Sequence, residues 1–378
     1  MRSHVLGFIG CLLACTCAAA GEPKTFPDAK HGRGEMTHLN GTPVLVLRGK
    51  PAERGEQFGI LAIKNAPAID DLHLNFLKDA GLDKKMGFIN LLVNKLKPGF
   101  PPEHFAEVEA AVKAADRDLS LILFANTVYD LSSMMGCSTV VVEKNRSKTG
   151  EPLFGRNFDW LPTKGITEHT LIVVSHPEGK RSFATITIAP IVGCISGMND
   201  AGLCVTLNEI HLRESKEKAP FDWTGTPVML AFRRVLEDCT TVDEAEKLLK
   251  GMKRTTTCCM TICDKSGGAV FEMTPQSVER RSAVKDVCLC TNHFRTDPLA
   301  LVAKCWRYDK LSPLQTHAEK LGVDDVFGEL DKVHQGKYTL QSMVFEPSVR
   351  KLHLKYADGN ATKQTASTFD LGKFFDAK

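Results

Sequence analysis

The sequence lacks a concentrated basic surface. Its lysine and arginine residues are spread along all 378 positions, and the formal net charge is only +3. Proteins that bind nucleic acid usually carry a basic stripe, often interleaved with aromatic residues, so a nucleic acid partner is not expected. Beyond residue 20, no run reaches the roughly 18 apolar residues of a membrane-spanning helix, so no transmembrane segment is expected either.

Zinc-type cysteine spacing is also missing. The chain has 13 cysteines, and Cys258, Cys259 and Cys263 lie close together in the sequence. However, they belong to a strand-like run and lack the paired two-residue spacings of a zinc site. No metal and no other cofactor are therefore expected. The cysteines after residue 20, apart from Cys137, are predicted to be small buried hydrophobic residues.

The first twenty residues are typical of a secretory signal peptide. Arg2 and His4 precede a short apolar run, and small alanines at 18–20 follow it. Cleavage after Ala20 would make the protein secreted or periplasmic. An alternative is a lipoprotein signal, in which Cys15 would carry a lipid anchor. A third interpretation is a buried N-terminal helix.

The predicted secondary structure of the rest of the sequence changes from mainly helical to mainly strand at residue 137. Residues 21–40 are polar and rich in glycine and proline, which predicts a loose leader, and residues 42–49 predict a strand. Helical patterns then extend to about residue 135. Strands dominate afterwards, and they are predicted at 138–144, 153–160, 169–176, 182–190, 202–210, 255–264, 268–275, 287–292, 339–346 and 350–356.

Later helices are predicted from Thr226-Pro227, over 241–251, over 297–311 and over 323–334. Strands, two helices, more strands and then helices indicate two sheets with helices on their outer faces. The expected fold class is therefore α+β, a four-layer αββα sandwich at 137–378. A mainly helical segment at 21–136 is expected to pack against it.

A hairpin is predicted around the turn-rich residues 145–152. If Val142 pairs with Leu153, Cys137 lies opposite about Phe158. Arg156, Asn157 and Asp159 then cluster near the cysteine. Since residues three apart on a regular strand point to opposite faces, Arg156 and Asp159 can both face Cys137 only if the strand ends or bulges.

Cys137 is the candidate nucleophile. If the Gly136–Cys137 bond is cut, Cys137 gains a free α-amine with a pKa of roughly 7.7–8.0, which can accept the thiol proton. One residue then supplies both nucleophile and base. Gly136 suits a cleavage site because it has no Cβ and tolerates strained backbone geometry. The alternative is that Cys137 is an ordinary buried strand residue.

Several segments in order resemble a known family. They are Gly-Cys-Ser at 136–138, Gly-Arg-Asn-Phe-Asp-Trp at 155–160, Gly-Met-Asn-Asp-Ala-Gly-Leu at 197–203, Thr-Asn-His-Phe at 291–294 and Cys-Trp-Arg-Tyr at 305–308. This order resembles the acyl-coenzyme A:6-aminopenicillanic acid acyltransferases of peptidase family C45, within the choloylglycine hydrolase-type N-terminal-nucleophile hydrolases. The resemblance spans about residues 42–358. The long hairpin loop at 145–152 favours the acyltransferase-like branch over bile-salt hydrolases.

The resemblance implies an N-terminal-nucleophile fold that cuts itself between Gly136 and Cys137 into associated alpha and beta chains. It also implies the site. Cys137 is nucleophile and base, Arg156 lies beside the thiol, and Asp159 holds the amine. The remaining residues are Asn208 as oxyanion donor, Asn292 beside the amine and the reacting carbonyl, and Arg307 as a supporting distal arginine.

The implied activity is hydrolysis of a small-molecule linear N-acyl amide through a thioester at Cys137. If an amine replaces water, the enzyme is an acyltransferase. Two further alternatives stay open: an unprocessed Cys–His hydrolase with His211 or His293 as base, and a non-catalytic binding protein. The sequence does not specify the acyl chain or the leaving amine.

Overall fold

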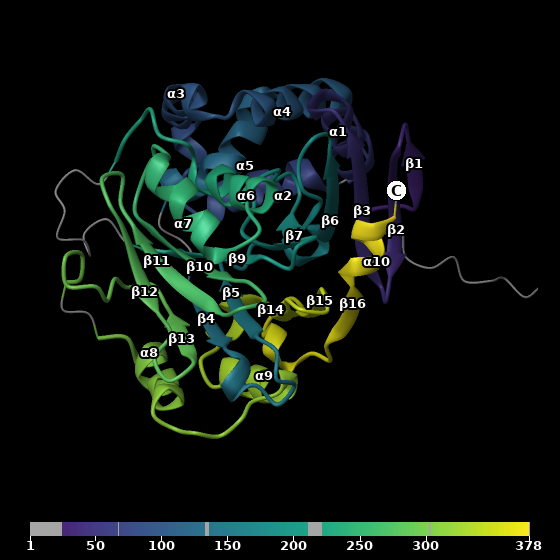
Figure 1. Ribbon diagram of the computed structural model, residues 1–378. Coiled ribbons are helices and arrows are strands. Elements are labelled where there is room, and N and C mark those ends of the chain that lie inside the picture. The colour runs from purple at the N-terminus through teal and green to yellow at the C-terminus, as the bar shows by residue number, and fades with distance from the viewer. Residues whose placement is uncertain (1–24, 67, 133–135, 211–220, 302–303, 378) are drawn as a thin grey trace, which may run out of the picture.

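A computed structural model describes residues 25–66, 68–132, 136–210, 221–301 and 304–377 (Figure 1). Within these ranges the strands form two sheets. The large sheet has the order β1 (Ala29–His31), β2 (Gly34–Leu39), β3 (Thr42–Gly49), β6 (Thr170–Pro177), β7 (Phe183–Ile188), β8 (Ser196–Asn199), β9 (Cys204–Glu209), β10 (Cys258–Cys263), β11 (Gly268–Met273) and β12 (Val278–Ser282). The small sheet has the order β13 (Val287–Cys290), β4 (Gly136–Val142), β5 (Leu153–Asp159), β14 (Thr339–Glu346), β15 (Lys351–Tyr356) and β16 (Ser367–Asp370).

Helices cover the outer faces of both sheets (Figure 1). Those over the large sheet are α1 (Pro51–Phe58), α2 (Ile69–Asp79), α3 (Met86–Leu96), α4 (Pro102–Ala115), α5 (Leu119–Leu131), α6 (Val228–Asp238) and α7 (Val242–Gly251). Those on the other side are α8 (Trp306–Leu311) and α9 (Val323–Asp331), and a short helix, α10 (Leu371–Asp376), ends the described chain.

Three apolar clusters show that the layers are stacked. One joins the helices α1 to α7 to the large sheet, for example Phe232 to Leu207. A second lies between the sheets and includes Ile172 from the large sheet and Phe154 from the small sheet. A third joins the small sheet to α9 and includes Val140 from the sheet and Leu330 from the helix. Because each sheet buries both faces, the expected four-layer αββα sandwich is confirmed.

The segment before residue 136 forms part of the large sheet. Strand β3 lies between β2 and β6 and pairs in parallel with β6, from Val44 opposite Ile172 to Gly49 opposite Pro177. The strand predicted at 42–49 is confirmed. This mainly helical segment therefore also supplies three strands, which continue the hydrogen bonding of the strands after residue 136.

The prediction of a loose leader at 21–40 is wrong for residues 29–39, which form β1 and β2. A tight turn explains the difference. Asn40 and Gly41 both have positive φ, 52° and 78°, and an Asn-Gly pair in this conformation is the preferred turn of a two-residue hairpin. The turn folds β2 back onto β3 and buries Met36 in the core.

The prediction of a helix over 297–311 is wrong over its first part, because α8 begins only at Trp306. Asp297-Pro298 is a local signal for a helix start, but the backbone just before it is hydrogen-bonded to a carboxylate from a strand distant in the sequence. Buried Glu272 on β11 accepts hydrogen bonds from the backbone N–H groups of Arg295 and Thr296, at 2.8 and 2.9 Å. These bonds hold the chain in a turn there.

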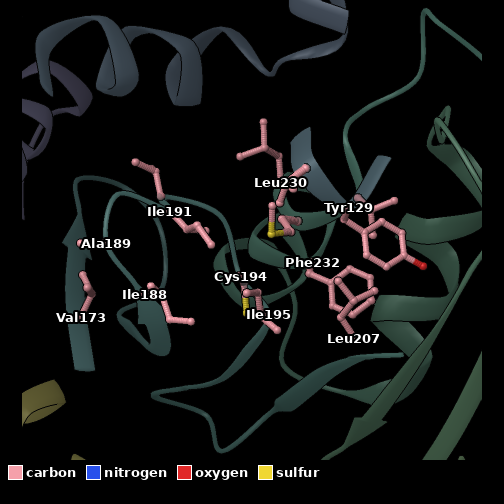
Figure 2. Close-up of a cluster of buried hydrophobic side chains, with 14 of the residues drawn as sticks. Tyr129, Val173, Ile188, Ala189, Ile191, Cys194, Ile195, Leu207, Leu230 and Phe232 are labelled. Carbon is pink, nitrogen blue, oxygen red and sulfur yellow. The ribbon is translucent and has the colours of Figure 1, made fainter. Parts of the chain in front are cut away.

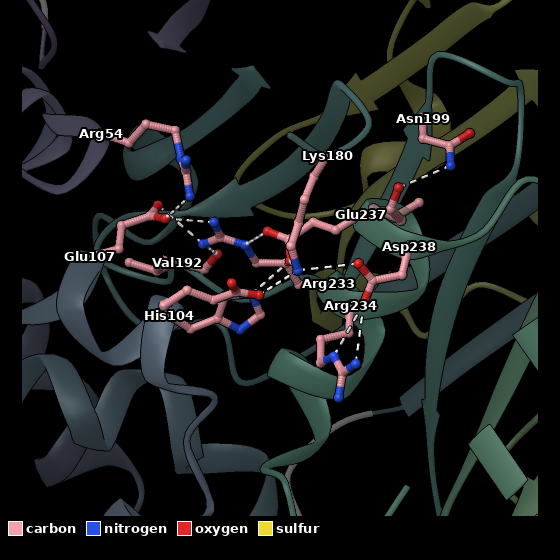
Figure 3. Close-up of polar contacts among 12 residues, drawn as sticks. Arg54, His104, Glu107, Lys180, Val192, Asn199, Arg233, Arg234, Glu237 and Asp238 are labelled. Carbon is pink, nitrogen blue, oxygen red and sulfur yellow. Dashed lines mark hydrogen bonds and ion pairs between the residues drawn. The ribbon is translucent and has the colours of Figure 1, made fainter. Parts of the chain in front are cut away.

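A buried ionic network joins α1 and α4 to α6 (Figure 3). Glu107 accepts hydrogen bonds from Arg54 at 2.7 Å and from Arg233 at 2.6 Å. Arg233 also donates to Glu237 at 2.8 Å, and His104 lies 2.8 Å from the same carboxylate. All five residues are at most 2% exposed. The network therefore ties residues before position 136 to residues after it.

Replacing Glu107 by Gln is expected to destabilise the fold by about 3–5 kcal/mol, because two buried guanidinium groups lose their shared anion. Urea titration of the free energy of unfolding measures this. The matched control is Glu103→Gln, which weakens a half-exposed pair with Lys180 and is expected to cost under about 1 kcal/mol. Equal losses in the two variants would show that the network does not hold the helices.

The network also gives a pH dependence. Burial lowers the pKa of His104 below its usual 6.5. Burial alone would raise the pKa of Glu107, but Arg233 and Arg54 outweigh it and hold that pKa below 4.5. In both cases the unfolded chain binds more protons than the folded one. Stability is therefore expected to fall as the pH drops below about 6.5 and again below about 4.5, and thermal unfolding across this range measures it.

Candidate active site

The predicted register of the hairpin is confirmed. Val142 lies opposite Leu153, and Cys137, the second residue of β4, lies opposite Phe158. The β-branched run of β4 favours a buried strand, and the turn-rich loop returns the chain along it as β5. Cys137 is fully buried. The hairpin thus places the candidate nucleophile at one end of the small sheet.

Arg156 contacts the thiol and connects the two sheets. One of its terminal nitrogens donates to the Cys137 Sγ at 3.1 Å, and the other donates to the Leu207 carbonyl of β9 at 2.6 Å. Its side chain has no exposed surface. Burial raises the pKa of the Cys137 thiol to about 11, although Arg156 opposes this rise. The thiol is therefore protonated at neutral pH, and the side chain that contacts it is a cation.

Asn292 and Arg307 hold the backbone of Cys137. The N–H of Cys137 donates to the Asn292 Oδ1 at 2.9 Å, and Arg307 donates to the same oxygen at 2.7 Å. Arg307 also donates to the carbonyl of Cys137 at 2.5 Å and to the Ser138 hydroxyl at 3.2 Å. Asn292 follows β13, and Arg307 is on α8. The structure thus brings both predicted residues to the nucleophile.

Asp159 lies beside Gly136, on the opposite face of β5 from Arg156. Its carboxylate accepts hydrogen bonds from Gln335 at 2.7 Å and from Thr339 at 2.5 Å, and Arg307 is 3.6 Å away. The two faces follow from the three-residue spacing. The backbone amide of Cys137 donates to Asn292, and Asp159 is placed next to the Gly136–Cys137 bond rather than next to the sulfur.

Asn157 does not belong to the cluster around the nucleophile, contrary to the prediction. Its side-chain amide donates to the Leu330 carbonyl of α9 at 2.8 Å, because Asn157 shares a face with Asp159. This asparagine therefore joins the small sheet to its outer helix.

Asn208 on β9 carries an unused buried donor. Its Oδ1 accepts a hydrogen bond from the Thr139 hydroxyl at 3.0 Å, which fixes the orientation of the amide. Its Nδ2 is buried and has no hydrogen-bond partner among the described residues. Leaving such a donor unpaired costs roughly 1–3 kcal/mol. The arrangement therefore suits a donor that binds the oxygen of a ligand, and Thr139 is a positioning residue that sequence reasoning missed.

A side chain at Gly136 would displace the end of the Gln335 side chain. A Cβ there would lie 2.1 Å from the Nε2 of Gln335 and 3.3 Å from the Cβ of Asp159. Gln335 and Thr339 reach the site because β14 pairs with β5, with Thr339 opposite Asp159. No local sequence motif indicates that these two residues belong to the site, because their position depends on pairing between distant strands.

Of the two histidines of the Cys–His alternative, the structure describes His293. His293 interacts with Cys305. Burial would raise the pKa of the Cys305 thiol, but hydrogen bonding with His293 and Thr291 outweighs it and lowers the pKa to about 6. His211 lies outside the described residues, as do Cys15 and the predicted signal peptide.

The predicted burial of the other cysteines is confirmed, but the lowered pKa of Cys305 is not that of a purely hydrophobic residue. All ten cysteines in the described part of the chain are buried and unpaired. Cys258 faces the helices, whereas Cys259 and Cys263 face the inter-sheet layer. The three side chains therefore do not converge on one point.

Comparison with known proteins places the chain in a family. The model of the acyl-coenzyme A:6-aminopenicillanic acid acyl-transferase family matches residues 144–360, which is more than half of the chain. The chain belongs to this acyl-transferase family. A curated member, the 40 kDa form of acyl-coenzyme A:6-aminopenicillanic-acid-acyltransferase from Emericella nidulans, is 30% identical over 154 residues. That match covers 39% of each protein, so the chain spans about two fifths of this relative.

Three solved structures are similar to part of the chain. The Caenorhabditis elegans ortholog of N-acylethanolamine-hydrolyzing acid amidase is 19% identical, with a TM-score of 0.46, over 62% of this chain and 99% of that one. A variant of conjugated bile acid hydrolase from Clostridium perfringens is 14% identical, with a TM-score of 0.47, over 63% and 93%. Penicillin V acylase from Agrobacterium tumefaciens is 15% identical, with a TM-score of 0.44, over 58% and 83%.

Helices of membrane-spanning length and hydropathy were also sought. None occurs in the part of this acyl-transferase family member that the structure describes.

The short distance from Gly136 to Gln335 predicts that the effects of mutations at these two positions on stability are coupled. In a Cys137→Ala background, Gly136→Ala is expected to destabilise the chain by about 1–3 kcal/mol, because the new methyl group displaces the Gln335 amide. Adding Gln335→Ala is expected to restore most of that loss, which urea unfolding of the double-mutant cycle measures. The control is Gly251→Ala, where the Cβ meets nothing within 4 Å. Strictly additive losses at 136 and 335 would contradict the predicted contact.

Proposed function

We propose that this chain is an exported, self-processing cysteine amidohydrolase of the N-terminal-nucleophile class. It cleaves linear N-acyl amide bonds through a thioester at Cys137. The observation that carries the proposal is the surroundings of the thiol. Its side-chain partner is the cation Arg156, whereas its own backbone nitrogen is held by Asn292. A base is therefore available in place if that nitrogen becomes a free amine.

Self-cleavage comes first. The Cys137 sulfur attacks the Gly136 carbonyl, the carbon–nitrogen bond breaks, and the nitrogen takes the thiol proton. Water then hydrolyses the Gly136 thioester, which leaves a Gly136 carboxylate and a free thiol and amine on Cys137. Asp159, beside Gly136, is assigned to hold the new ammonium group, and Gln335 and Thr339 keep its carboxylate in position.

Amide hydrolysis repeats this chemistry on a substrate. The α-amine of Cys137 takes the thiol proton, and the thiolate attacks the amide carbonyl. The Nδ2 of Asn208 is assigned to stabilise the oxyanion, because it is buried, oriented and unpaired. The ammonium then protonates the leaving amine, and water hydrolyses the acyl thioester. Transfer of the acyl group to an amine instead of water is the second candidate, and the name of the family favours it.

The two chains made by cleavage are proposed to remain together as alpha (21–136) and beta (137–378). The parallel pairing of β3 with β6 and the Arg54–Glu107–Arg233 network support this. Export through residues 1–20 makes the enzyme secreted or periplasmic, and a lipid on Cys15 would anchor it instead.

Intact mass and N-terminal sequencing test the processing. The wild-type protein is expected to give two fragments, one of which begins Cys-Ser-Thr-Val, while Cys137→Ala gives one fragment. The remaining N-terminus is expected at Gly21, whereas a lipid-modified Cys15 would identify the anchored form. A folded wild-type chain that stays whole would refute self-processing and leave the Cys–His and binding-protein alternatives.

Asn208→Ala tests the oxyanion role. It is expected to lower kcat about 100- to 1,000-fold on an N-acyl amide, with little change in KM, because the lost hydrogen bond matters in the transition state. Steady-state kinetics on processed enzyme measures this. Asn157→Ala, another buried asparagine whose amide faces α9, is the control and is expected to retain kcat. Equal losses of kcat in both variants would contradict the assignment.

A further inference from the structure

Two cysteines meet across the layer between the sheets. Cys259 lies on β10 of the large sheet and Cys290 on β13 of the small sheet, and both belong to the apolar cluster between the sheets. Neither residue has exposed surface, and both are free thiols in the structure. The thiol of Cys259 donates a hydrogen bond to the sulfur of Cys290. The reaction proposed at Cys137 makes no use of this pair.

Strand pairing places the two thiols beside the candidate oxyanion donor. Cys259 lies opposite Asn208 within the large sheet, and Cys290 lies opposite Thr139 within the small sheet. Residues directly opposite each other in paired strands have side chains on the same face. The contact between the two thiols therefore runs alongside the 3.0 Å hydrogen bond from Thr139 to Asn208, one strand further along in each sheet.

The residues that precede Asn208 and Cys259 face the other way, because successive side chains of a strand alternate between its two faces. Leu207 and Cys258 belong to the cluster between the large sheet and its helices, together with Phe232. Figure 2 shows Leu207 and Phe232 in this layer. Cys258 is therefore a neighbouring cysteine that faces away from β13.

The two sheets are close together at this point. Packed sheets are commonly about 10 Å apart, but Cα atoms of β4 lie within 8 Å of Cα atoms of β9, and those of β13 within 8 Å of those of β11. Strand β10 lies between β9 and β11. The short side chains of Thr139 and Thr206 also meet across the gap, with 3.3 Å between their hydroxyl oxygens. Since a disulfide joins Cα atoms roughly 4.4–6.8 Å apart, a small movement of the strands is enough to form one here.

We propose that Cys259 and Cys290 form a disulfide that cross-links the two sheets beside Asn208. The bond replaces the contact between the two thiols and holds β10 to β13, so it fixes the distance between the sheets where Thr139 meets Asn208. Disulfides form and persist in oxidising compartments, which agrees with the proposed export. The inference rests on the geometry of the two sheets and not on the reaction at Cys137.

The oxidant is a small disulfide such as glutathione disulfide. Burial would raise the pKa of the Cys290 thiol, but hydrogen bonding with Cys259 and the charge of Arg281 outweigh it and lower that pKa. The Cys290 thiolate attacks one sulfur of the oxidant, which forms a mixed disulfide and releases one glutathione. Cys259 then loses its proton, attacks the Cys290 sulfur and releases the second glutathione. Because both cysteines are buried, this exchange takes place before the sheets close or when they open.

Disulfide mapping in Cys137→Ala tests the proposal, since this variant lacks the nucleophile and the result is independent of processing and catalysis. Reduced protein is equilibrated with glutathione disulfide in urea just below its unfolding midpoint, then alkylated in denaturant and digested with trypsin. The tryptic peptides 255–265 and 286–295 are expected to be joined by one disulfide.

Single substitutions in the same background identify the two sulfurs. The join is expected to be lost in Cys259→Ala and in Cys290→Ala. It is expected to be retained in Cys258→Ala and in Cys288→Ala, the matched controls on the same two strands. Full alkylation of both peptides, or a join that survives in Cys259→Ala, would overturn the proposal. Processed enzyme that hydrolyses no amide would refute the proposed function and leave the disulfide in place.

Discussion

The buried guanidinium of Arg156 is the constraint on which the site depends. A cation without exposed surface is costly unless its donors are paired, and Arg156 finds partners on both sheets. It reaches from β5 to the backbone carbonyls of Leu207 and Ile195 and to the sulfur of Cys137. The same group therefore fixes the separation of the sheets at this end and the position of the thiol. The sandwich and the nucleophile site form one structure here, because neither sheet can shift without exposing or unpairing this charge.

Much of this arrangement could be predicted from the sequence, because it is governed by strand periodicity. A β-branched run, a turn-rich loop and a second strand set the pairing of Cys137 with Phe158 and the position of Arg156 beside the thiol. The parity of a strand also explains why Asp159 and Asn157 face away from the sulfur. Asn292 and Arg307 could be named only from the resemblance to the family, since nothing in their local sequence specifies that they meet at the backbone of Cys137.

The rest depends on contacts between distant segments. Glu272 accepts hydrogen bonds from backbone N–H groups just before residue 297, and the local sequence gives no sign of these bonds. The helix predicted from 297 therefore does not begin there. Gln335 and Thr339 reach Asp159 only because β14 pairs with β5. Strands β1 and β2 were missed although the Asn40-Gly41 turn is a local signal, because their polar composition resembles a leader. Thr139 was missed for another reason: its hydroxyl orients Asn208 across the gap between the sheets, and strand periodicity does not give the pairing of faces between two sheets.

The order of synthesis adds a consequence. The residues that surround Cys137 come from β9, from the segment after β13 and from α8. The partners of Asp159 are Gln335, shortly before β14, and Thr339, the first residue of β14. Strand β3 likewise cannot pair until β6, which is far downstream, has been made. Such non-local parallel pairing forms slowly. On a ribosome, the nucleophile therefore emerges long before its surroundings exist. The cleavage proposed at Gly136 would therefore wait until nearly the whole chain has been made and folded, so the connectivity of the sandwich would set its timing.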